Sequence, residues 1–392
     1  MFHRTAAAIV LAVPTAALLQ VAGTLGAQAQ ATAVQAGDEC LATAPYAAPF
    51  LPPPREIAKG LSLSGHLDME TVSTLSDRSG DAAVQTAVLQ VGVSLDTASA
   101  DLWRSGRLDL SLAGIKTGGD LAQASGAVQT PSNIWAPDAL RLYQFSYGQD
   151  LGAASLRAGV MDLNDYFDTT PAAGQLANAS FGISPTLTAN APIATYPNPG
   201  VGLMGGLDWG HGWAARLGVW QGNPPAASHL LRDGAMYITE LQRTWRTEAK
   251  EPPKAFVKLG AWHYAAADAA LGRSTGGGYA VAEGHRARSG GTHLAAFVQF
   301  GASPGQVNAV PYYLGIGTRI SGLVSGGTHD NLSLGVARAW IRGSRPEAVW
   351  EANYAIRVHD GVYLQPDLQW IQHAGGANPG MFVLALRLHL EM

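Results

Sequence analysis

The chain has 392 residues, of which 47% are hydrophobic and only 14% are Asp, Glu, Lys or Arg, and its formal net charge is −4. Soluble domains carry about 25% charged residues, so the low proportion indicates a surface that largely contacts something other than water. The acidic balance excludes a nucleic-acid partner, which would need a basic surface, and no internal run reaches the roughly 20 apolar residues of a membrane-spanning helix.

The first 60 residues have the composition of targeting and linker sequence. Arg4, the apolar stretch from Ala6 to Leu19 and the small residues that follow predict a secretory signal peptide over residues 1–31. An uncleaved anchor helix is the alternative. Residues 32–60, which include three consecutive prolines, predict a stiff periplasmic tail. The single cysteine, Cys40, excludes an intramolecular disulfide.

From residue 61 onward the sequence alternates between apolar and polar residues in short runs. In the first run Leu61, Leu63, Leu67 and Met69 occupy odd positions and polar residues lie between them. This period of two predicts β-strands with one apolar and one polar face. The following runs of this kind are Ala87–Leu95, Leu108–Leu112, Leu140–Tyr147, Ser155–Met161, Val201–Trp209, Trp213–Trp220, Tyr237–Arg246, Ala255–Tyr264, Thr292–Phe300, Tyr312–Ser321 and Asn331–Trp340.

The last segment, residues 347–392, shows the alternation most clearly. It contains three runs separated by turns, at Asp360–Gly361 and at residues 375–379, with large apolar residues at even positions and charged or amide residues at odd ones. In a transmembrane barrel the apolar face of such strands contacts lipid and the polar face contacts water in the lumen. Residues 61–392 are therefore predicted to form an all-β fold, a transmembrane antiparallel β-barrel of about 16 strands.

The connections fall into two kinds. Some are tight turns, whereas residues 117–137, 162–200, 221–234 and 265–291 predict long loops rich in Gly, Pro, Asn, Asp and Ser. This asymmetry is typical of outer-membrane barrels.

One aromatic run has two possible positions. If Arg141 faces the lumen, the alternation places Tyr143, Phe145 and Tyr147 on the same inner face. A position in the aromatic girdle at the membrane interface is equally compatible with the sequence.

Motifs of catalysis and metal binding give no positive signal. No nucleophile elbow, paired-histidine zinc motif, P-loop or dinucleotide fingerprint occurs, so no enzyme activity and no cofactor are predicted. Asp162, Asp165 and Asp168 are spaced by three in one loop, which is compatible with a cation site or a solvated loop. The alternating ligand pattern of a calcium loop is missing, so no metal is predicted.

An ordered series of segments resembles the carbohydrate-selective porins of the OprB type. Its central part runs from Gly159 to Phe167, from Asn178 to Pro185 and from Tyr196 to Gly200. The later segments are Val219–Gly222, Leu259–His263, Trp350–Tyr354, Leu364–Gln369 and Leu386–Leu388.

The resemblance implies a 16-stranded barrel in the outer membrane of a Gram-negative bacterium, with loops folded into the lumen. It implies passive passage of sugars, without catalysis or energy coupling. The implied partners are carbohydrates as permeants, outer-membrane lipid and the barrel assembly machinery, and the chain is expected to be a monomer or a homotrimer.

Sugars present hydroxyl edges and apolar ring faces, so charged groups and aromatic rings in the lumen are candidate contacts. The expected permeants are glucose-like mono- and oligosaccharides, with saturable diffusion. The alternatives are a general or anion-type porin, or a structural or adhesive barrel. The candidate pore-lining residues are Arg157, Asp162, Asn164, Asp165, Glu240, Glu351, Arg357, Asp367, Arg387, Trp220 and Trp262. Simple wetting of the lumen is the alternative role for the charged residues, and the membrane-interface girdle is the alternative position for the two tryptophans.

Overall fold

The computed structural model describes residues 55–75, 82–224, 232–246, 253–267, 273–287, 292–303, 305–324 and 330–391. The predicted signal peptide, most of the predicted tail and Cys40 lie outside these residues. The last part of the predicted tail, Arg55–Ala58, forms a short strand, β1, that pairs with the first strand of the barrel.

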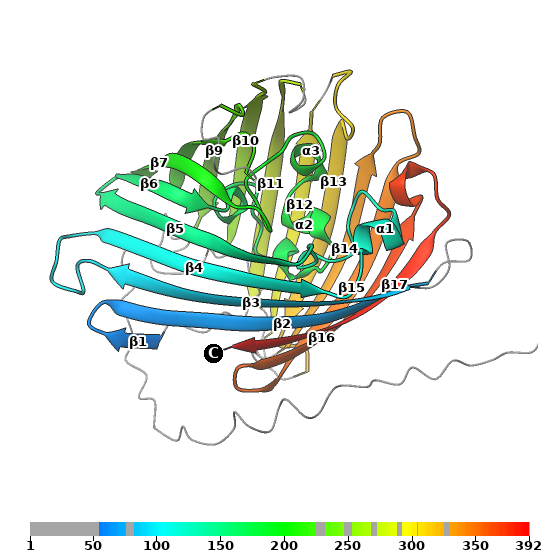
Figure 1. The fold of residues 1–392 in the computed structure, drawn as a ribbon, viewed down its shortest axis with the longest axis horizontal. Coiled ribbons are helices and arrows are strands. Elements are labelled where there is room, and N and C mark those ends of the chain that lie inside the picture. The colour runs from blue at the N-terminus through cyan, green and yellow to red at the C-terminus, as the bar shows by residue number, and fades with distance from the viewer. Residues whose placement is uncertain are drawn as a thin grey trace, which may run out of the picture. The chain divides into compact units, whose positions relative to one another are not determined.

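The described residues form one antiparallel sheet that closes on itself (Figure 1). Each strand from β2 to β17 pairs with the next along the chain, and β17 pairs with β2 from Phe382↔Leu75 to Glu391↔His66. The barrel therefore has 16 strands, which confirms the predicted fold and strand number. The strands are β2 (Leu61–Leu75), β3 (Ala82–Asp96), β4 (Gly106–Thr117), β5 (Ala139–Leu151), β6 (Ala154–Met161), β7 (Gly200–Gly210), β8 (Trp213–Gln221), β9 (Ala235–Trp245), β10 (Ala255–Ala265), β11 (Thr275–Ala287), β12 (His293–Ala302), β13 (Tyr312–Ser321), β14 (Asp330–Trp340), β15 (Glu347–His359), β16 (Val362–Gln372) and β17 (Met381–Glu391).

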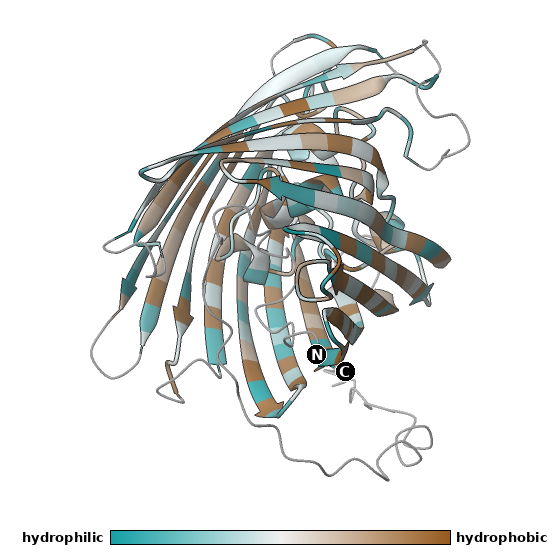
Figure 2. Ribbon diagram, turned by 90° about the vertical axis from the view of Figure 1, so that its left-hand side faces the viewer, coloured by the Kyte–Doolittle hydropathy of each residue, from teal (hydrophilic) through white to brown (hydrophobic). Residues whose placement is uncertain are grey.

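The alternation in the sequence becomes two chemically different faces of the wall. Along the strands in Figure 2 hydrophobic and hydrophilic residues follow one another in short steps. On β17 the side chains of Phe382 and Leu384 are 54% and 41% exposed and point outward, whereas Val383 between them is buried inside. An outer face of large apolar side chains fits lipid, because exposing such a surface to water is unfavourable.

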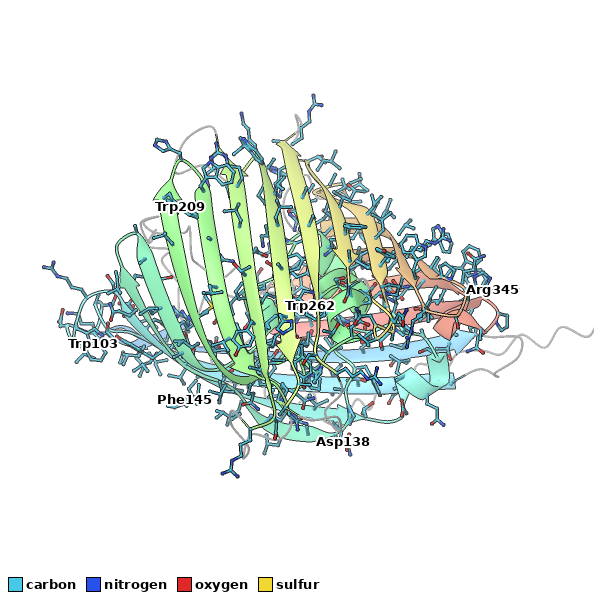
Figure 3. The ribbon with its side chains drawn as sticks, turned by 90° about the horizontal axis from the view of Figure 1, so that it is seen from above. Trp103, Asp138, Phe145, Trp209, Trp262 and Arg345 are labelled. Carbon is cyan, nitrogen blue, oxygen red and sulfur yellow. The ribbon has the colours of Figure 1, made fainter. Side chains whose placement is uncertain are left out.

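A β-bulge changes the alternation in β5. The pairing with β4 steps from Ser111↔Gln144 to Leu112↔Leu142, so Tyr143 is left without a partner residue on β4. Tyr143 points into the lumen, which is one of the two positions compatible with the sequence, but Phe145 is 57% exposed on the outer face, and Figure 3 shows it at the perimeter. An inward position is therefore wrong for Phe145 and Tyr147, because an extra residue reverses the alternation.

The predicted long loop at residues 265–291 is wrong, because its second half is β11. Tyr279, Val281 and Glu283 face inward and are buried. The residues between them, Ala280 and Ala282, form the outer face of the strand. Because alanine is no more hydrophobic than the inward Tyr279 and Val281, the sequence shows no clear alternation there.

The helices are short: α1 (Leu121–Ser125), α2 (Ala179–Gly182), α3 (Pro185–Thr188) and the 3-10 turns η1 (Leu163–Asp165), η2 (Ala173–Gln175) and η5 (Ala374–Gly376). Within the described ranges none of these helices has the length and apolar character to span a membrane.

The two ends of the barrel differ in their connections. The long connections β4–β5, β6–β7 and β8–β9 lie at one end, and the two-residue turns β5–β6, β7–β8 and β15–β16 lie at the other. Outer-membrane barrels place long loops outside the cell and short turns in the periplasm. The end with the long connections is accordingly the extracellular end.

The two faces predict opposite responses to the same substitution at adjacent residues in the middle of β3. Leu89 is 43% exposed on the outer face and Gln90 lines the lumen. We expect Leu89→Arg to destabilise the barrel in lipid vesicles by about 2–4 kcal/mol, because a guanidinium near the bilayer midplane loses its water. Gln90→Arg serves as the control and should change stability little. The free energy of unfolding, from denaturant titration in vesicles, checks both; equal losses would contradict the assignment of the faces.

Candidate functional site

The connection between β6 and β7, residues 162–199, is folded into the barrel and packs on its inner wall (Figure 1). Phe167 belongs to an apolar cluster with Trp220 of β8, in which the two rings meet edge to face at 5.8 Å. Phe181 of α2 belongs to a second cluster and meets Phe297 of β12 in the same manner at 6.1 Å. These contacts seat the inward loop against one side of the lumen, and the prediction of an inward-folded loop is confirmed.

A buried carboxylate on β15 holds the backbone of this loop. Glu351 accepts hydrogen bonds from the N–H groups of Ala177 and Asn178, the latter at 3.0 Å. Asn353 beside it donates to Glu351 at 3.1 Å. These N–H groups belong to the two residues that precede α2, of which Asn178 is the N-cap, and they have no partner within the helix and need an acceptor.

Two further carboxylates act in the same way. Glu240 of β9 accepts from the N–H of Asp168 at 3.2 Å and from the hydroxyl of Tyr279 at 2.8 Å. Glu283 of β11 accepts from the N–H of Ala172 at 2.9 Å. All three wall carboxylates are at least 96% buried, so their partners are needed to offset the cost of removing charge from water.

Cations of the wall bind carbonyl groups of the same loop. Lys258 donates to the carbonyl of Thr169 at 2.8 Å, and Arg216 donates to the carbonyl of Tyr166 at 2.8 Å. Both lie near Glu240, at 3.9 Å and 3.7 Å. The loop is thus held by donors and acceptors on both sides of its backbone.

The β4–β5 connection is held similarly at the extracellular end. Glu347 accepts from the N–H groups of Val128 at 3.0 Å and Gln129 at 2.7 Å. Gln369 of β16 donates to the carbonyl of Pro131 at 2.7 Å.

The predicted loop carboxylates organise the turn that begins the inward loop. Asp162 accepts from the Tyr143 hydroxyl at 2.7 Å and from the Tyr196 N–H at 2.8 Å, which joins β5 to both ends of the loop. Asn164 donates to the carbonyl of Phe167 at 3.1 Å.

Asp168 lies apart from this turn. Its carboxylate accepts from the N–H of Ser184 at 2.8 Å. Burial raises the pKa of Asp168 to about 7, and this hydrogen bond only partly opposes the effect. In the described part of the chain no group of three or more His, Cys, Asp or Glu side chains is arranged to hold a metal ion.

The loops leave an open cavity of about 1100 Å³ on the other side of the lumen. Its wall is formed mainly by β2–β6 and β15–β17, and its other side by the inward loop. The polar residues that line it include Ser64, His66, Asp68, Gln90, Ser94, Arg107, Asp109, Ser111, Asn133, Tyr143, Gln144, Ser155, Arg157, Asp162, Asn164, Asp165, Tyr166, Gln175, Tyr196, Gln365, Arg387 and His389.

One wall of the cavity carries a carboxylate shared by two arginines. Asp109 lies 2.9 Å from Arg107 Nε and 2.9 Å from Arg157 Nη1, and the Ser94 hydroxyl donates to it at 2.7 Å. The Arg157 guanidinium also lies over the ring of Tyr166, 5.8 Å from its centroid. This group offers donors, acceptors and an aromatic ring within a short distance.

A second polar group lies on β2 and β17. Arg387 donates to Glu70 and to the side-chain carbonyl of Asn133, both at 2.8 Å. Next to it His389 Nδ1 lies 2.7 Å from Asp68. With these contacts, all three arginines that line the cavity have a carboxylate partner.

The eleven sequence-predicted candidates divide into two sets. The structure brings together at the cavity Arg157, Asp162, Asn164, Asp165 and Arg387. The remaining six, which are Glu240, Glu351, Arg357, Asp367, Trp220 and Trp262, are absent from its lining in the described structure. Glu240 and Glu351 bind the loop, Asp367 is buried beside Gln369, and Arg357 lies at the periplasmic turn, 3.7 Å from Asp360.

The two tryptophans face inward, so the alternative of a membrane-interface girdle is wrong for them. Trp220 and Trp262 are 1% and 4% exposed beneath the inward loop, and Figure 3 labels Trp262 near the middle of the barrel. Glycines opposite provide the space, because a Cβ atom at Gly202 would lie 2.5 Å from the Trp220 indole.

Sequence reasoning missed several lining residues, notably Asp68, Arg107, Asp109 and His389. The alternation of the first and third runs and of the last segment already placed these residues opposite the apolar face, so the signal was present. The alternation does not show where the inward loop lies, and the loop determines which inward-facing residues border the open cavity.

Comparisons with known proteins agree with this architecture. The profile of the carbohydrate-selective porin, OprB family, matches residues 58–392, which confirms the resemblance seen in the sequence. No curated protein sequence matches the chain significantly.

Solved structures with the same fold include OprB from Pseudomonas putida. Its high-pH structure has 17% sequence identity and a TM-score of 0.74, over 85% of this chain and 94% of the other. Its low-pH structure has 16% identity and a TM-score of 0.57, over 85% and 93%. A variant of the Rhodopseudomonas blastica porin has 11% identity and a TM-score of 0.54, over 85% and 100%.

The loop contacts predict that Glu351→Ala destabilises the barrel and widens the path. Two buried N–H groups lose their acceptor, at a cost of about 1–3 kcal/mol each. Glu351→Gln keeps an acceptor oxygen for one of the two N–H groups and is the graded control, with a loss of about half that size. Denaturant unfolding measures the loss, and single-channel recording should show larger and noisier conductance for Glu351→Ala than for Glu351→Gln. Identical conductance in both variants would mean that this contact does not position the loop.

Proposed function

The chain belongs to the carbohydrate-selective porin OprB family, and from this premise we propose that neutral, glucose-like mono- and oligosaccharides diffuse through its lumen passively and with saturable kinetics. As a member of this family it is a sugar-selective porin of the Gram-negative outer membrane. The polar cavity between the inward loop and β2–β6 is the proposed path.

The pairing of the cavity's arginines is the observation that carries the proposal. Arg107 and Arg157 share Asp109, and Arg387 contacts Glu70. An arginine that is bonded to a carboxylate attracts a free anion less than an unpaired arginine does, and its remaining donors can still bond hydroxyl groups. This favours an uncharged, hydroxyl-rich permeant over the anion-type alternative.

Ring stacking supplies the second element of the proposed sugar contact. Tyr143, Tyr166 and Tyr196 lie on the cavity's inner side, with Tyr143 and Tyr196 centroids 6.3 Å apart. Of the predicted contacts we retain the five that border the cavity, which are Arg157, Asp162, Asn164, Asp165 and Arg387. A site of this kind must bind weakly enough to release its cargo.

The proposed role includes no chemical step and no energy source besides the sugar gradient. We propose that residues 1–31 are removed as a signal peptide, that residues 32–60 form a periplasmic tail, and that the barrel assembly machinery inserts residues 61–392. A monomer and a homotrimer are both compatible with this role.

Swelling of vesicles that contain the purified protein tests the substrate class. We expect sugars to enter faster than zwitterions of the same size, with rates that saturate. Equal rates for both classes would favour a general porin instead.

The shared carboxylate predicts opposite changes in ion selectivity for two substitutions. Asp109→Asn leaves Arg107 and Arg157 without their partner and should shift the reversal potential towards anions. Arg157→Gln should shift it towards cations. Each removes one possible sugar contact, so the half-saturating sugar concentration should rise about two- to tenfold. Bilayer recordings in a salt gradient, with sugar block as a second readout, measure both; shifts of the same sign would exclude the shared pair from the conducting path.

A further inference from the structure

The outer face of the barrel carries an apolar groove of about 590 Å³ at β13–β17, towards the extracellular end. Its outward residues form two rows across the strands. One row is Ile316, Val336, Trp350, Trp370 and Phe382, and the other is Thr318, Leu334, Ala352 and Leu368.

The groove exists because Ala352 is small. Ala352 pairs with Leu334 on one side and with Leu368 on the other. Its methyl group is much smaller than these two side chains, so the outer wall is hollow at Ala352. Trp350 and Trp370 stack above it with centroids 4.5 Å apart. A hollow of this shape on a lipid-facing wall accepts an apolar chain better than a flat surface does.

A cation lies directly above the groove, on the face where a charge is unusual. Arg338 is exposed on the outer face of β14, two residues beyond Val336, or about 7 Å along the strand. Its guanidinium lies over the ring of Trp340, 5.1 Å from the centroid. Among the described residues no carboxylate pairs with it. Arginine on a lipid face costs little only near the interface, where its head reaches polar groups.

The neighbouring extracellular turn extends the positive charge. Arg342 and Arg345 are both exposed, and Figure 3 shows Arg345 at the rim of the barrel. Their backbone N–H groups donate to Ala309 at 2.9 Å and Gly376 at 3.2 Å, which fixes the turn to both adjacent connections. The connections at residues 303–311, 341–346 and 373–380 contain no Asp or Glu.

We propose that this surface binds a phosphorylated, acylated glycolipid of the outer leaflet, the lipid A class, with an acyl chain in the groove and a phosphate on Arg338. Arg342 and Arg345 add attraction for a second phosphate or for core sugars bearing anionic groups. An apolar groove with the Arg338 guanidinium one row above it, which pairs with no carboxylate in the described part of the chain, matches the chemistry of that amphiphile. The position at the extracellular end favours this lipid over a phospholipid of the inner leaflet.

Titration of the detergent-purified full chain with diphosphoryl lipid A, followed by native mass spectrometry, tests the proposal. We expect Arg338→Gln to weaken binding about tenfold or more, as for loss of a hydrogen bond between charged groups. Lys116→Gln is the matched control, because Lys116 is also an exposed cation at the extracellular end but already pairs with Asp138. Its affinity should equal that of the unchanged protein.

Filling the groove tests the acyl contact separately. Ala352→Phe should weaken lipid A binding, whereas Ala282→Phe on the outward side of β11 should not. Retention of the folded band in unheated gel samples verifies folding. Should Ala352→Phe fail to fold, Arg338→Gln decides alone, since it removes no packed apolar side chain.

Three results would overturn the proposal. One is an equal effect of Arg338→Gln and Lys116→Gln. Another is binding of phosphatidylglycerol as tight as that of lipid A, with the same loss in Arg338→Gln, which would identify a phospholipid site. The third is an oligomer that Ala352→Phe dissociates, which would identify the groove as a contact between copies of this chain.

Discussion

The structure depends on the requirement that every backbone N–H and C=O group in hydrocarbon has a partner. The β17–β2 pairing satisfies it by removing both edges of the sheet. Once the sheet is closed, each strand has one face towards lipid and one towards the lumen, and the period of two in the sequence follows from that geometry. At the bulge in β5 the extra residue adds a side chain to the lumen face, and the inward loop supplies Asp162 as a partner for the Tyr143 hydroxyl.

Inside the lumen the requirement is met by side chains instead of strands. A loop buried in the barrel brings its own N–H and C=O groups out of water, and Glu351, Glu240 and Glu283 accept from them while Lys258 and Arg216 donate. Charged residues that face inward therefore have two roles, which sequence alone does not separate. Beneath the loop they replace water for the backbone, and beside the cavity they remain available to a permeant.

The closed barrel, its strand number and the outward face could be predicted, because they depend on local alternation and on the cost of exposing polar backbone to lipid. The failures have specific causes. β11 was missed since alanines on its outer face provide no contrast to Tyr279 and Val281. Phe145 was misplaced because a bulge is a change of one residue that periodicity does not reveal. The role of Glu351 depends on Ala177 and Asn178, more than 170 residues away in the sequence, and no local pattern encodes that contact.

The position of the open path follows from the difference between the two halves of the inner wall. Where the wall presents Trp220, Tyr264 and Phe297, the inward loop gains apolar contacts and excludes water. On β3–β6 the inner face instead carries Gly92, Ser94, Ser111 and Gly148, with Asp109 and its two arginines. A loop packed there would gain little apolar contact and would have to desolvate three charges. The polar half of the wall therefore retains water, and the apolar half binds the inward loop. A solute whose hydroxyl groups replace those of water can follow the path along the polar half.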